Sequence, residues 1–276
     1  MNVFLPHAVP EALELVANNS GAVPIAGGTD LLVHWPVRGE AHDRSYVDLS
    51  ALEALRPLSW TADALVLGAL TTYWDVIRDA RVAREFPLLV HAARQVGAIQ
   101  IQARGTWAGN IVNASPAADG VPVLMAYHAV VVLESRRGRE EVPLDRFYSG
   151  YKEMHRRPDQ LVVAIRVPRR AYTFQVFDKI GSRRAQAIAK VGLAVTHSAA
   201  GWRVVAASVA PTIRRCPALE RLLETGARVA SPEDLLPAIA QDVAPIDDIR
   251  SSAGYRTQVM ARVLFHHLRE HWGRPA

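Results

Sequence analysis

Residues 104–133 read RGTWAGNIVNASPAADGVPVLMAYHAVVVL, and this stretch decides how the chain folds. Its first half is rich in small and turn-forming residues, whereas its second half is apolar. Asp119 opens an apolar run with helical spacing, and three β-branched residues, 130–132, follow it. The pattern predicts a tight turn, a short strand, a polar loop, a helix and a second strand, in that order.

The same stretch also suits a ligand. Small residues with free backbone N–H groups allow the main chain to approach a phosphate closely. Thr106, Asn110, Asn113 and Ser115 add neutral side chains that form hydrogen bonds. Taken alone, the stretch fits a surface loop between two core elements equally well.

A second glycine-rich stretch, VPIAGGTDLLV at residues 23–33, strengthens the ligand interpretation. Its apolar start predicts a strand that runs into the Gly27–Gly28 pair. Thr29 is placed to cap a helix that begins at Asp30 and buries the two leucines after it. A strand, a glycine turn and a helix N-terminus together favour an anion. Because the chain has two such loops, we expect a dinucleotide with a pyrophosphate to lie between them.

The composition limits the class of protein. The chain has 276 residues, of which 50% are hydrophobic and 21% are charged, enough for one large domain or two smaller ones. The net charge is +5, but the basic residues are scattered in short groups. No basic helix alternates with exposed aromatic residues, so nucleic acid is not an expected partner. The basic groups fit a solvated surface, or an acidic partner or anionic cofactor.

The single cysteine, Cys216, excludes an intrachain disulfide and a cluster held by cysteines of this chain. It precedes Pro217 at an expected helix start and is interpreted as a small apolar residue. The first 14 residues lack the basic and apolar regions of a signal peptide. The longest apolar run, residues 121–133, is interrupted by His128 and too short to cross a membrane. We expect a cytoplasmic protein without membrane insertion.

The order of elements predicts two domains. Residues 1 to about 56 form a small α/β unit that holds the first glycine loop, and Pro57 marks a seam before a second unit that ends near residue 169. From residue 170 to 276, strands followed by helices predict a separate α+β domain. Further elements are expected as helices at 87–96, 144–151, 217–224, 232–241 and 252–272, and as strands at 161–167, 172–180, 187–196 and 202–209.

The sequence predicts neither a catalytic residue nor a metal site in this chain. It contains no GxGxxG or GxxxxGK[ST] motif and no nucleophile elbow. His267 and His271 are four residues apart on the last helix, but no HExxH arrangement accompanies them. We interpret this end of the helix as solvated and basic. The KIGSRR stretch at 179–184 places a cation where it could face the two loops, although an ordinary basic hairpin explains it equally well.

Several stretches together resemble a known family. They are AGGTD at 26–30, TWAGNIVNASPAAD at 106–119, FDKIGSRRAQAIAKV at 177–191, SVAPT at 208–212 and APIDDIRSSAGYR at 244–256. This combination resembles the FAD-binding medium subunit of molybdenum hydroxylases, which include xanthine dehydrogenases and carbon monoxide dehydrogenase. The resemblance covers essentially the whole chain, with both family domains in order.

The resemblance implies a fold and a set of FAD contacts. The fold is α+β: a two-part FAD-binding domain of the vanillyl-alcohol-oxidase (PCMH) type, then a C-terminal α+β domain with a three-stranded sheet and helices. The FAD diphosphate and ribityl chain are expected to lie across the two glycine loops. The implied contacts are Pro24, Ile25, Ala26, Gly27, Gly28, Thr29, Asp30, Leu31, Val96, Thr106, Trp107, Ala108, Gly109, Asn110, Asp119, Val162 and Lys179.

Two of these positions depart from the family pattern. Val96 stands where some members place an aromatic ring near the cofactor, so stacking is lost there. The family usually has TIGGN where this chain has TWAGN at 106–110. Ala108 therefore adds a methyl group where the main chain approaches phosphate.

The resemblance also implies a function with partners. A molybdopterin large subunit oxidises the substrate, a 2Fe–2S small subunit passes electrons to the FAD of this chain, and NAD+ or another acceptor receives them. The expected assembly is a dimer of heterotrimers, and residues 179–191 lean toward xanthine dehydrogenase-like members. Two alternatives stay open: a self-sufficient FAD-dependent oxidase or reductase, and a scaffold subunit that has lost FAD.

Overall fold

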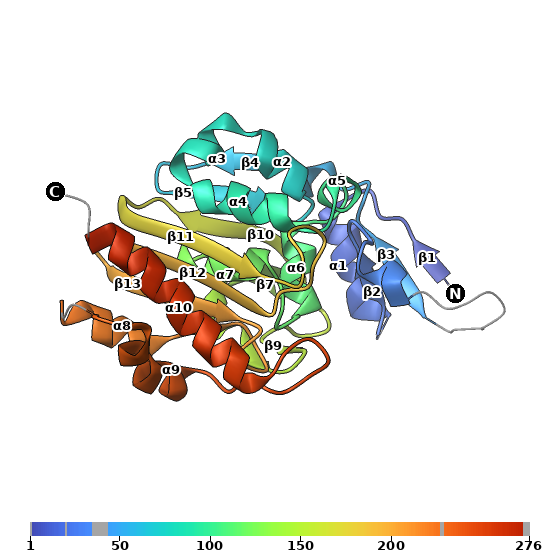
Figure 1. Cartoon of the computed structure of the whole chain (residues 1–276). Helices are drawn as coiled ribbons and strands as arrows, with labels where there is room; N and C mark the ends of the chain where they lie inside the picture. The colour runs from blue at the N-terminus through green and yellow to red at the C-terminus, as the bar shows by residue number, and fades with distance from the viewer. Residues whose placement is uncertain (1, 20, 35–43, 227–228, 273–276) are drawn as a thin grey trace.

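The computed structural model describes residues 2–19, 21–34, 44–226 and 229–272. A small N-terminal unit lies at one end of the molecule, and the last helix ends at the other (Figure 1). The unit has a parallel three-stranded sheet in the order β1-β3-β2. Its elements are β1 (Asn2–Phe4), α1 (Val9–Asn18), β2 (Val23–Ile25), η1 (Leu31–His34), β3 (Ser45–Asp48) and η2 (Glu53–Leu55).

The second unit contains an antiparallel five-stranded sheet in the order β4-β5-β10-β6-β7. Its strands are β4 (Leu58–Trp60), β5 (Ala64–Gly68), β6 (Val130–Ser135), β7 (Gly138–Pro143) and β10 (Leu161–Pro168). The expected strand at 161–167 is therefore confirmed. β10 is buried at most positions, because it lies at the centre of this sheet.

Helices cover this sheet and connect its strands (Figure 1). They are α2 (Tyr73–Arg78), α3 (Ala80–Glu85), α4 (Pro87–Gln95), α5 (Ile99–Gln102), α6 (Trp107–Asn113) and α7 (Gly120–Ala126). Thr72 and Asp75 form a capping box that begins α2. The expected helix at 87–96 is confirmed as α4.

The short strand expected after Gly105 is wrong, because this segment is the helix α6. The side chain of Thr106 caps the helix by accepting a hydrogen bond from Gly109 N. Trp107 and Ile111 are four residues apart, so they share one helical face, and both are fully buried. The sequence suggested a short strand here, but burial of this face and the Thr106 cap favour a helix.

The helix expected at 144–151 is also wrong. Only one 3-10 turn, η3 (Leu144–Arg146), forms there. The chain then enters a two-stranded hairpin of β8 (Tyr148–Gly150) and β9 (Glu153–Met154). The Tyr148 hydroxyl donates to Ile111 O at 2.9 Å, which ties this hairpin to α6.

The C-terminal sheet has four strands instead of three. Its order is β11-β12-β13-β14, all antiparallel. The strands are β11 (Tyr172–Ile180), β12 (Val191–Ser198), β13 (Gly201–Ala207) and β14 (Arg214–Arg215). The sequence missed β14, which has two residues and an exposed, charged pattern.

Both faces of this sheet are buried. Ala194 and Val205 pack with the core shared by the N-terminal and second units, whereas Leu193 and Val204 pack with the C-terminal helices. This alternation follows from the two-residue period of a strand. The sheet therefore joins the two parts of the molecule, and β12 and β13 pack on α7.

The outer face carries α8 (Pro217–Glu224), η4 (Pro232–Leu235), α9 (Leu236–Asp242) and α10 (Ala253–Trp272). These confirm the helices expected after residue 216, and Ser231 forms a capping box with Asp234. α10 crosses the face of the sheet (Figure 1). Leu264 and Leu268 are fully buried as expected, whereas Val259 and Val263 are only partly buried. No helix within the described ranges is long and apolar enough to cross a membrane.

Candidate functional site

A cavity of about 580 Å³ lies between the N-terminal unit, α6 and the start of β10. This volume falls within the usual range of small-molecule and cofactor pockets. The residues that line the cavity are Val23, Pro24, Ala26, Gly27, Gly28, Thr29, Asp30, Leu31, Leu49, Ala69, Tyr73, Val96, Ile101, Gly105, Thr106, Ala108, Gly109, Asn110, Val112, Asn113, Lys152, Arg156, Gln160, Leu161 and Val162. Both glycine loops therefore face one cavity.

The two glycine loops touch at Gly27. A Cβ atom added to Gly27 would lie 1.8 Å from the Arg104 carbonyl oxygen, so only glycine fits there. A Cβ added to Gly105 would lie 2.9 Å from Ile101 O and 3.3 Å from Thr29 Oγ1. The glycines thus allow the two backbones to pack against each other, and this contact fixes the distance between the loops.

The first loop exposes a row of unpaired N–H groups. Gly28 has a φ of +72°, a conformation that glycine adopts without strain. Among the described residues, no backbone N–H group at positions 27–30 donates a hydrogen bond to the protein main chain. Successive free N–H groups beside a left-handed residue form a concave site for an anion. These N–H groups lie at the Gly27–Gly28 turn, where the sequence predicted an anion site, and that site stays a prediction.

The helix expected after this loop is shorter and less buried than predicted. It is a single 3-10 turn, η1, with a hydrogen bond from Leu32 N to Gly28 O. Leu31 is half-buried and lines the cavity. Leu32 is 64% exposed, so the expectation that it is buried is wrong. A helix of one turn presents only part of its circumference to the core, and Leu32 lies on the outer side.

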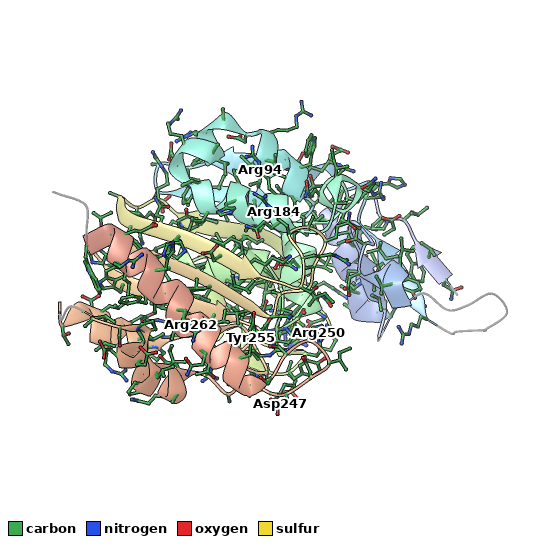
Figure 2. All side chains as sticks on the ribbon, viewed as in Figure 1. Arg94, Arg184, Asp247, Arg250, Tyr255 and Arg262 are labelled. Atoms are coloured by element: carbon green, nitrogen blue, oxygen red, sulfur yellow. The ribbon has the colours of Figure 1, made fainter. Side chains whose placement is uncertain are left out.

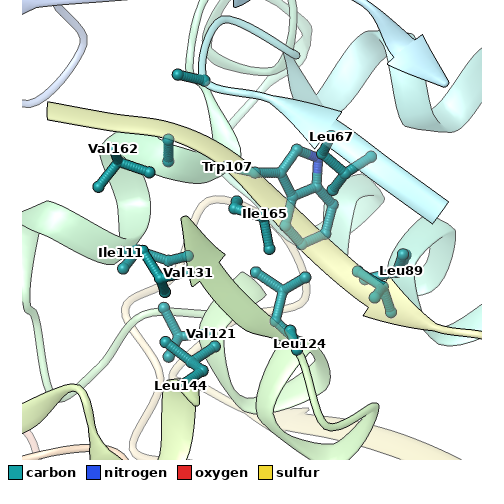
Figure 3. Close-up of a cluster of buried hydrophobic side chains, with 14 of the residues drawn as sticks. Leu67, Leu89, Trp107, Ile111, Val121, Leu124, Val131, Leu144, Val162 and Ile165 are labelled. Carbon is teal, nitrogen blue, oxygen red and sulfur yellow. The ribbon is translucent and has the colours of Figure 1, made fainter. Parts of the chain in front are cut away.

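The second loop is held by the core cluster in Figure 3. Trp107 and Ile111 lie among Leu67, Val121 and Ile165, so α6 is anchored through its inner face. The next residues along the helix then line the cavity. Ala108 is only 5% exposed, and its methyl group is therefore mostly packed against protein.

The structure places most of the predicted cofactor residues on the cavity wall. Val96 and Val162 line it together with the residues of both glycine loops. Ile25, Trp107, Asp119 and Lys179 do not line it. Ile25 is held in the sheet as part of β2 and accepts a hydrogen bond from Leu49 N, and Trp107 points into the core.

Asp119 and Lys179 form a buried ion pair beside the cavity. The Lys179 ammonium lies 2.6 Å from Asp119 Oδ2 and also donates to Gln95 O at 3.0 Å. The Lys179 side chain is only 7% exposed and the Asp119 side chain only 13%. Burial raises the pKa of Asp119 to about 6, and the attraction of Lys179 opposes that rise. The pair links β11 to the start of α7 and the end of α4, so Lys179 lies at the junction of the two domains as expected.

Three polar residues form a chain at the cavity, and the sequence had assigned only Asp30 of them to the site. Asn113 Nδ2 donates to Asp30 Oδ1 at 2.9 Å. Lys152 Nζ donates to Asn113 O at 2.6 Å and to Asn113 Oδ1 at 2.8 Å. The chain connects the first loop, the end of α6 and the β8–β9 turn. Asn113 lies within the stretch that suggested a ligand loop, but nothing in the sequence places Lys152 near it.

Arg156 and Gln160 also line the cavity and were missed. In the sequence, Arg156 and Arg157 form one of the short basic groups that fit a solvated surface. The β8–β9 hairpin brings Arg156 to the cavity through its contact with α6, and such a contact has no local sequence signal.

The paired arginines of the 179–184 stretch do not reach the cavity wall. Arg183 and Arg184 are exposed, and Arg183 bonds to the Ala185 and Gln186 carbonyls. Figure 2 labels Arg184 on the β11–β12 connection and Arg94 on α4. Of this basic stretch, only Lys179 is close to the candidate site.

The last helix is less solvated than predicted. His267 is hydrogen-bonded to Asp178, and the His271 ring packs 4.8 Å from the Phe174 ring. His266 is exposed and pairs with Glu270. No group of three metal-ligating side chains occurs in the part of the chain that the structure describes. Cys216 is fully buried, as its interpretation as a small apolar residue predicts.

The residues of the cavity fit FAD. The free N–H groups at 27–30 suit a diphosphate, and the apolar wall residues such as Val96, Ile101 and Leu161 suit flat rings. The side chains on the wall that can ionise are Asp30, Tyr73, Lys152 and Arg156. Burial raises the pKa of Tyr73, which therefore stays protonated. This wall binds and orients a cofactor but offers no paired acid and base for a substrate.

Two family models match the chain and together cover most of it. The FAD binding domain in molybdopterin dehydrogenase matches residues 1–170. The CO dehydrogenase flavoprotein C-terminal domain matches residues 177–271.

Individual proteins agree with these matches. The carbon monoxide dehydrogenase medium chain of Hydrogenophaga pseudoflava is 31% identical over 98% of this chain and 96% of its own length. The xanthine dehydrogenase FAD-binding subunit of Escherichia coli O157:H7 is 28% identical over 91% of this chain and 88% of its own length. A solved structure of carbon monoxide dehydrogenase from H. pseudoflava superposes with a TM-score of 0.87 at 28% identity, covering 100% of this chain and 98% of that chain. The chain thus belongs to the family of FAD-binding subunits of molybdenum hydroxylases.

Proposed function

We propose that this chain relays electrons within a multi-subunit molybdenum hydroxylase. A molybdopterin large subunit oxidises the substrate, and a small subunit with 2Fe–2S clusters delivers the electrons to this chain. NAD+ or another acceptor then removes them. When FAD is bound, it supplies the redox chemistry by taking up electrons and releasing them. The observation that carries the proposal is the cavity between the two glycine loops, with its unpaired N–H groups at residues 27–30.

The protein groups divide the binding of FAD between them. We assign the diphosphate to the N–H groups of residues 27–30 and to the backbone of residues 108–110 that faces them. Val96 and Val162 contribute apolar contacts to the rings. Val162 also contacts FAD through its main chain. Asp119 and Lys179 complete the site from behind the wall, because their ion pair fixes the start of α7 against the end of α4.

Partner chains supply the remaining centres. The described residues contain no cluster of metal ligands, and Cys216 is buried, so we assign the iron–sulfur and molybdenum centres to other subunits. The relatives are named as a medium chain and an FAD-binding subunit, which supports an assembly of several chains. A dimer of heterotrimers and a cytoplasmic location stay predictions.

The domain division and the substrate are also proposals. We divide the chain into an FAD-binding domain at 1–169, with subdomains at about 1–56 and 57–169, and a C-terminal domain at 170–276. The residues matched by the two family models support this division. The leaning toward a xanthine dehydrogenase-like substrate stays a prediction, because relatives of both substrate classes resemble the chain to a similar degree.

The visible spectrum of the purified chain tests the central step. We expect flavin absorbance bands and about one FAD per chain, either as purified or after reconstitution. Co-expression with the 2Fe–2S and molybdopterin subunits from neighbouring reading frames should then yield one complex. In that complex the flavin should be reduced when substrate is added. A colourless chain that takes up no FAD would support the scaffold alternative instead.

A further inference from the structure

Arg156 is a cation on the cavity wall, and its position is fixed by the protein. It lies two residues after the end of β9, and its backbone N–H donates to Met154 O at 2.8 Å. Its Nη1 group donates to Gln160 O at 2.7 Å and to Arg157 O at 3.3 Å. These bonds hold the guanidinium beside the first residues of β10, which also line the cavity.

The guanidinium of Arg156 lacks an acidic partner among the described residues. Its Nε atom is buried and has no hydrogen-bond partner. No ion pair within the described ranges involves Arg156, whereas its neighbour Arg157 pairs with Asp159 and Glu140. Burial lowers the pKa of Arg156, because the charged form is desolvated. A buried donor of a charged group is expensive to leave unpaired, so each such group in a native structure needs an explanation.

The charges on the cavity wall indicate what the partner is. Among the described residues, Lys152 is the other cation on the wall, and its ammonium is already bound to Asn113. Asp30 is the acidic residue on the wall, and it accepts a hydrogen bond from Asn113. The charge of Arg156 is therefore not neutralised by the wall itself. An anionic part of the ligand fits this charge better than a neutral ring does.

We propose that Arg156 is a further cofactor-anchoring residue whose guanidinium binds the diphosphate of FAD. The proposal rests on the proposed function, because it requires FAD in this cavity. The diphosphate is the anionic part of oxidised FAD, and Arg156 adds a side-chain cation to the backbone N–H groups at residues 27–30. Arginine suits this role because its planar group donates several hydrogen bonds to phosphate oxygens.

The test compares two substitutions that remove the same charge one residue apart. Arg156→Gln removes the unpaired cation from the wall, and Arg157→Gln removes a cation whose contacts lie away from the cavity. FAD affinity is measured by quenching of flavin fluorescence in apoprotein, and ADP affinity by its competition with FAD. We expect Arg156→Gln to weaken both FAD and ADP by roughly 10-fold, since a hydrogen bond to a charged group is lost. Arg157→Gln should leave both affinities within about twofold of the wild type.

Two further measurements separate anchoring from a structural role. The affinity of the wild type should fall more steeply with salt than that of Arg156→Gln, because one ionic contact is missing in the variant. The melting temperature of the apoprotein should change little in Arg156→Gln, because removal of the desolvated charge offsets the loss of the Nη1 hydrogen bonds to Gln160 O and Arg157 O. Arg156→Lys keeps the charge but loses the planar guanidinium, so its FAD affinity should lie between those of the wild type and Arg156→Gln.

Specific results would overturn the inference. They are an unchanged FAD affinity in Arg156→Gln, an equal loss in Arg157→Gln, or a loss for FAD that ADP does not share. The last result would place Arg156 at the flavin end. If the wild type binds no FAD, the proposed function fails instead, so the two failures are distinguishable.

Discussion

Replacing Gly27 with alanine perturbs the contact between the two glycine loops. In the native chain the Gly27 backbone packs against the Arg104 carbonyl, where a Cβ atom would lie 1.8 Å from the oxygen. A Cβ atom is essentially never closer than 3.0 Å to such an atom, so the loops must separate by more than about 1 Å. Arg104 is followed by the loop that faces the cavity, so this separation widens the site itself.

The expected losses of stability and FAD affinity follow from the contacts that the displaced loops make. Overpacking of this kind destabilises a fold by about 1–3 kcal/mol. A displacement of that size also breaks at least one hydrogen bond between the backbone at residues 27–30 and the diphosphate, which costs about 1.5–3 kcal/mol. We therefore expect FAD to bind roughly 10-fold to 100-fold more weakly to Gly27→Ala.

Affinity and stability must be measured separately. FAD affinity comes from fluorescence titration of apoprotein, and stability from urea unfolding. Gly138→Ala is the matched control: Gly138 has a φ of +117° with no atom within 4 Å of an added Cβ, and it lies in the β6–β7 hairpin outside the cavity. The control should lose some stability but keep its FAD affinity. A folded Gly27→Ala protein that binds FAD as tightly as the wild type would refute the reasoning.

Three further predictions follow from the same site. Lys179→Met leaves the buried Asp119 carboxyl unpaired, so the free energy of unfolding at neutral pH, measured by urea denaturation, should fall by about 3–5 kcal/mol. The reduction potential of the flavin should shift as well. No change in either quantity would place Lys179 outside the site. Because burial raises the pKa of Asp119 to about 6, the folded chain holds its proton more tightly than the unfolded chain does. The resulting stability is present below the unfolded pKa near 3.8 and is lost as the pH rises through about 6, and the double variant Asp119→Asn/Lys179→Met should lack this decline. The chain expressed alone should oxidise no purine or aldehyde, and robust substrate-dependent flavin reduction by the isolated chain would favour the self-sufficient oxidase.

The long, periodic and capped elements were predictable from the sequence. α4, α8 and α10 follow from apolar spacing with proline or glycine at their ends, and β10 and β11 follow from β-branched runs. Local preference and burial agree in these segments, so a single window of sequence is sufficient. The prediction for residues 107–113 was wrong, because the small and turn-forming residues there suggested a turn and a short strand, whereas the Thr106 cap and the buried Trp107–Ile111 face favour a helix.

The candidate site was predictable in part, for a related reason. The glycine loops can be recognised from their residues alone, since Gly27 is needed for a close backbone contact and Gly28 for a positive φ. Their separate positions in the sequence did not show that they touch. The Arg104 carbonyl supplies that contact, and it became visible only when the backbones were placed side by side.

By itself, the sequence determined the α+β class, the two phosphate-type loops and the family to which the chain belongs. The tertiary structure decided which side chains meet around the cavity. Lys179 became one half of a buried ion pair because β11 packs on α4, which brings Lys179 to Asp119, 60 residues away along the chain. Arg156 reached the cavity wall because a hairpin packs on α6. Contacts of this kind depend on the packing of distant elements, and no local pattern of residues encodes them.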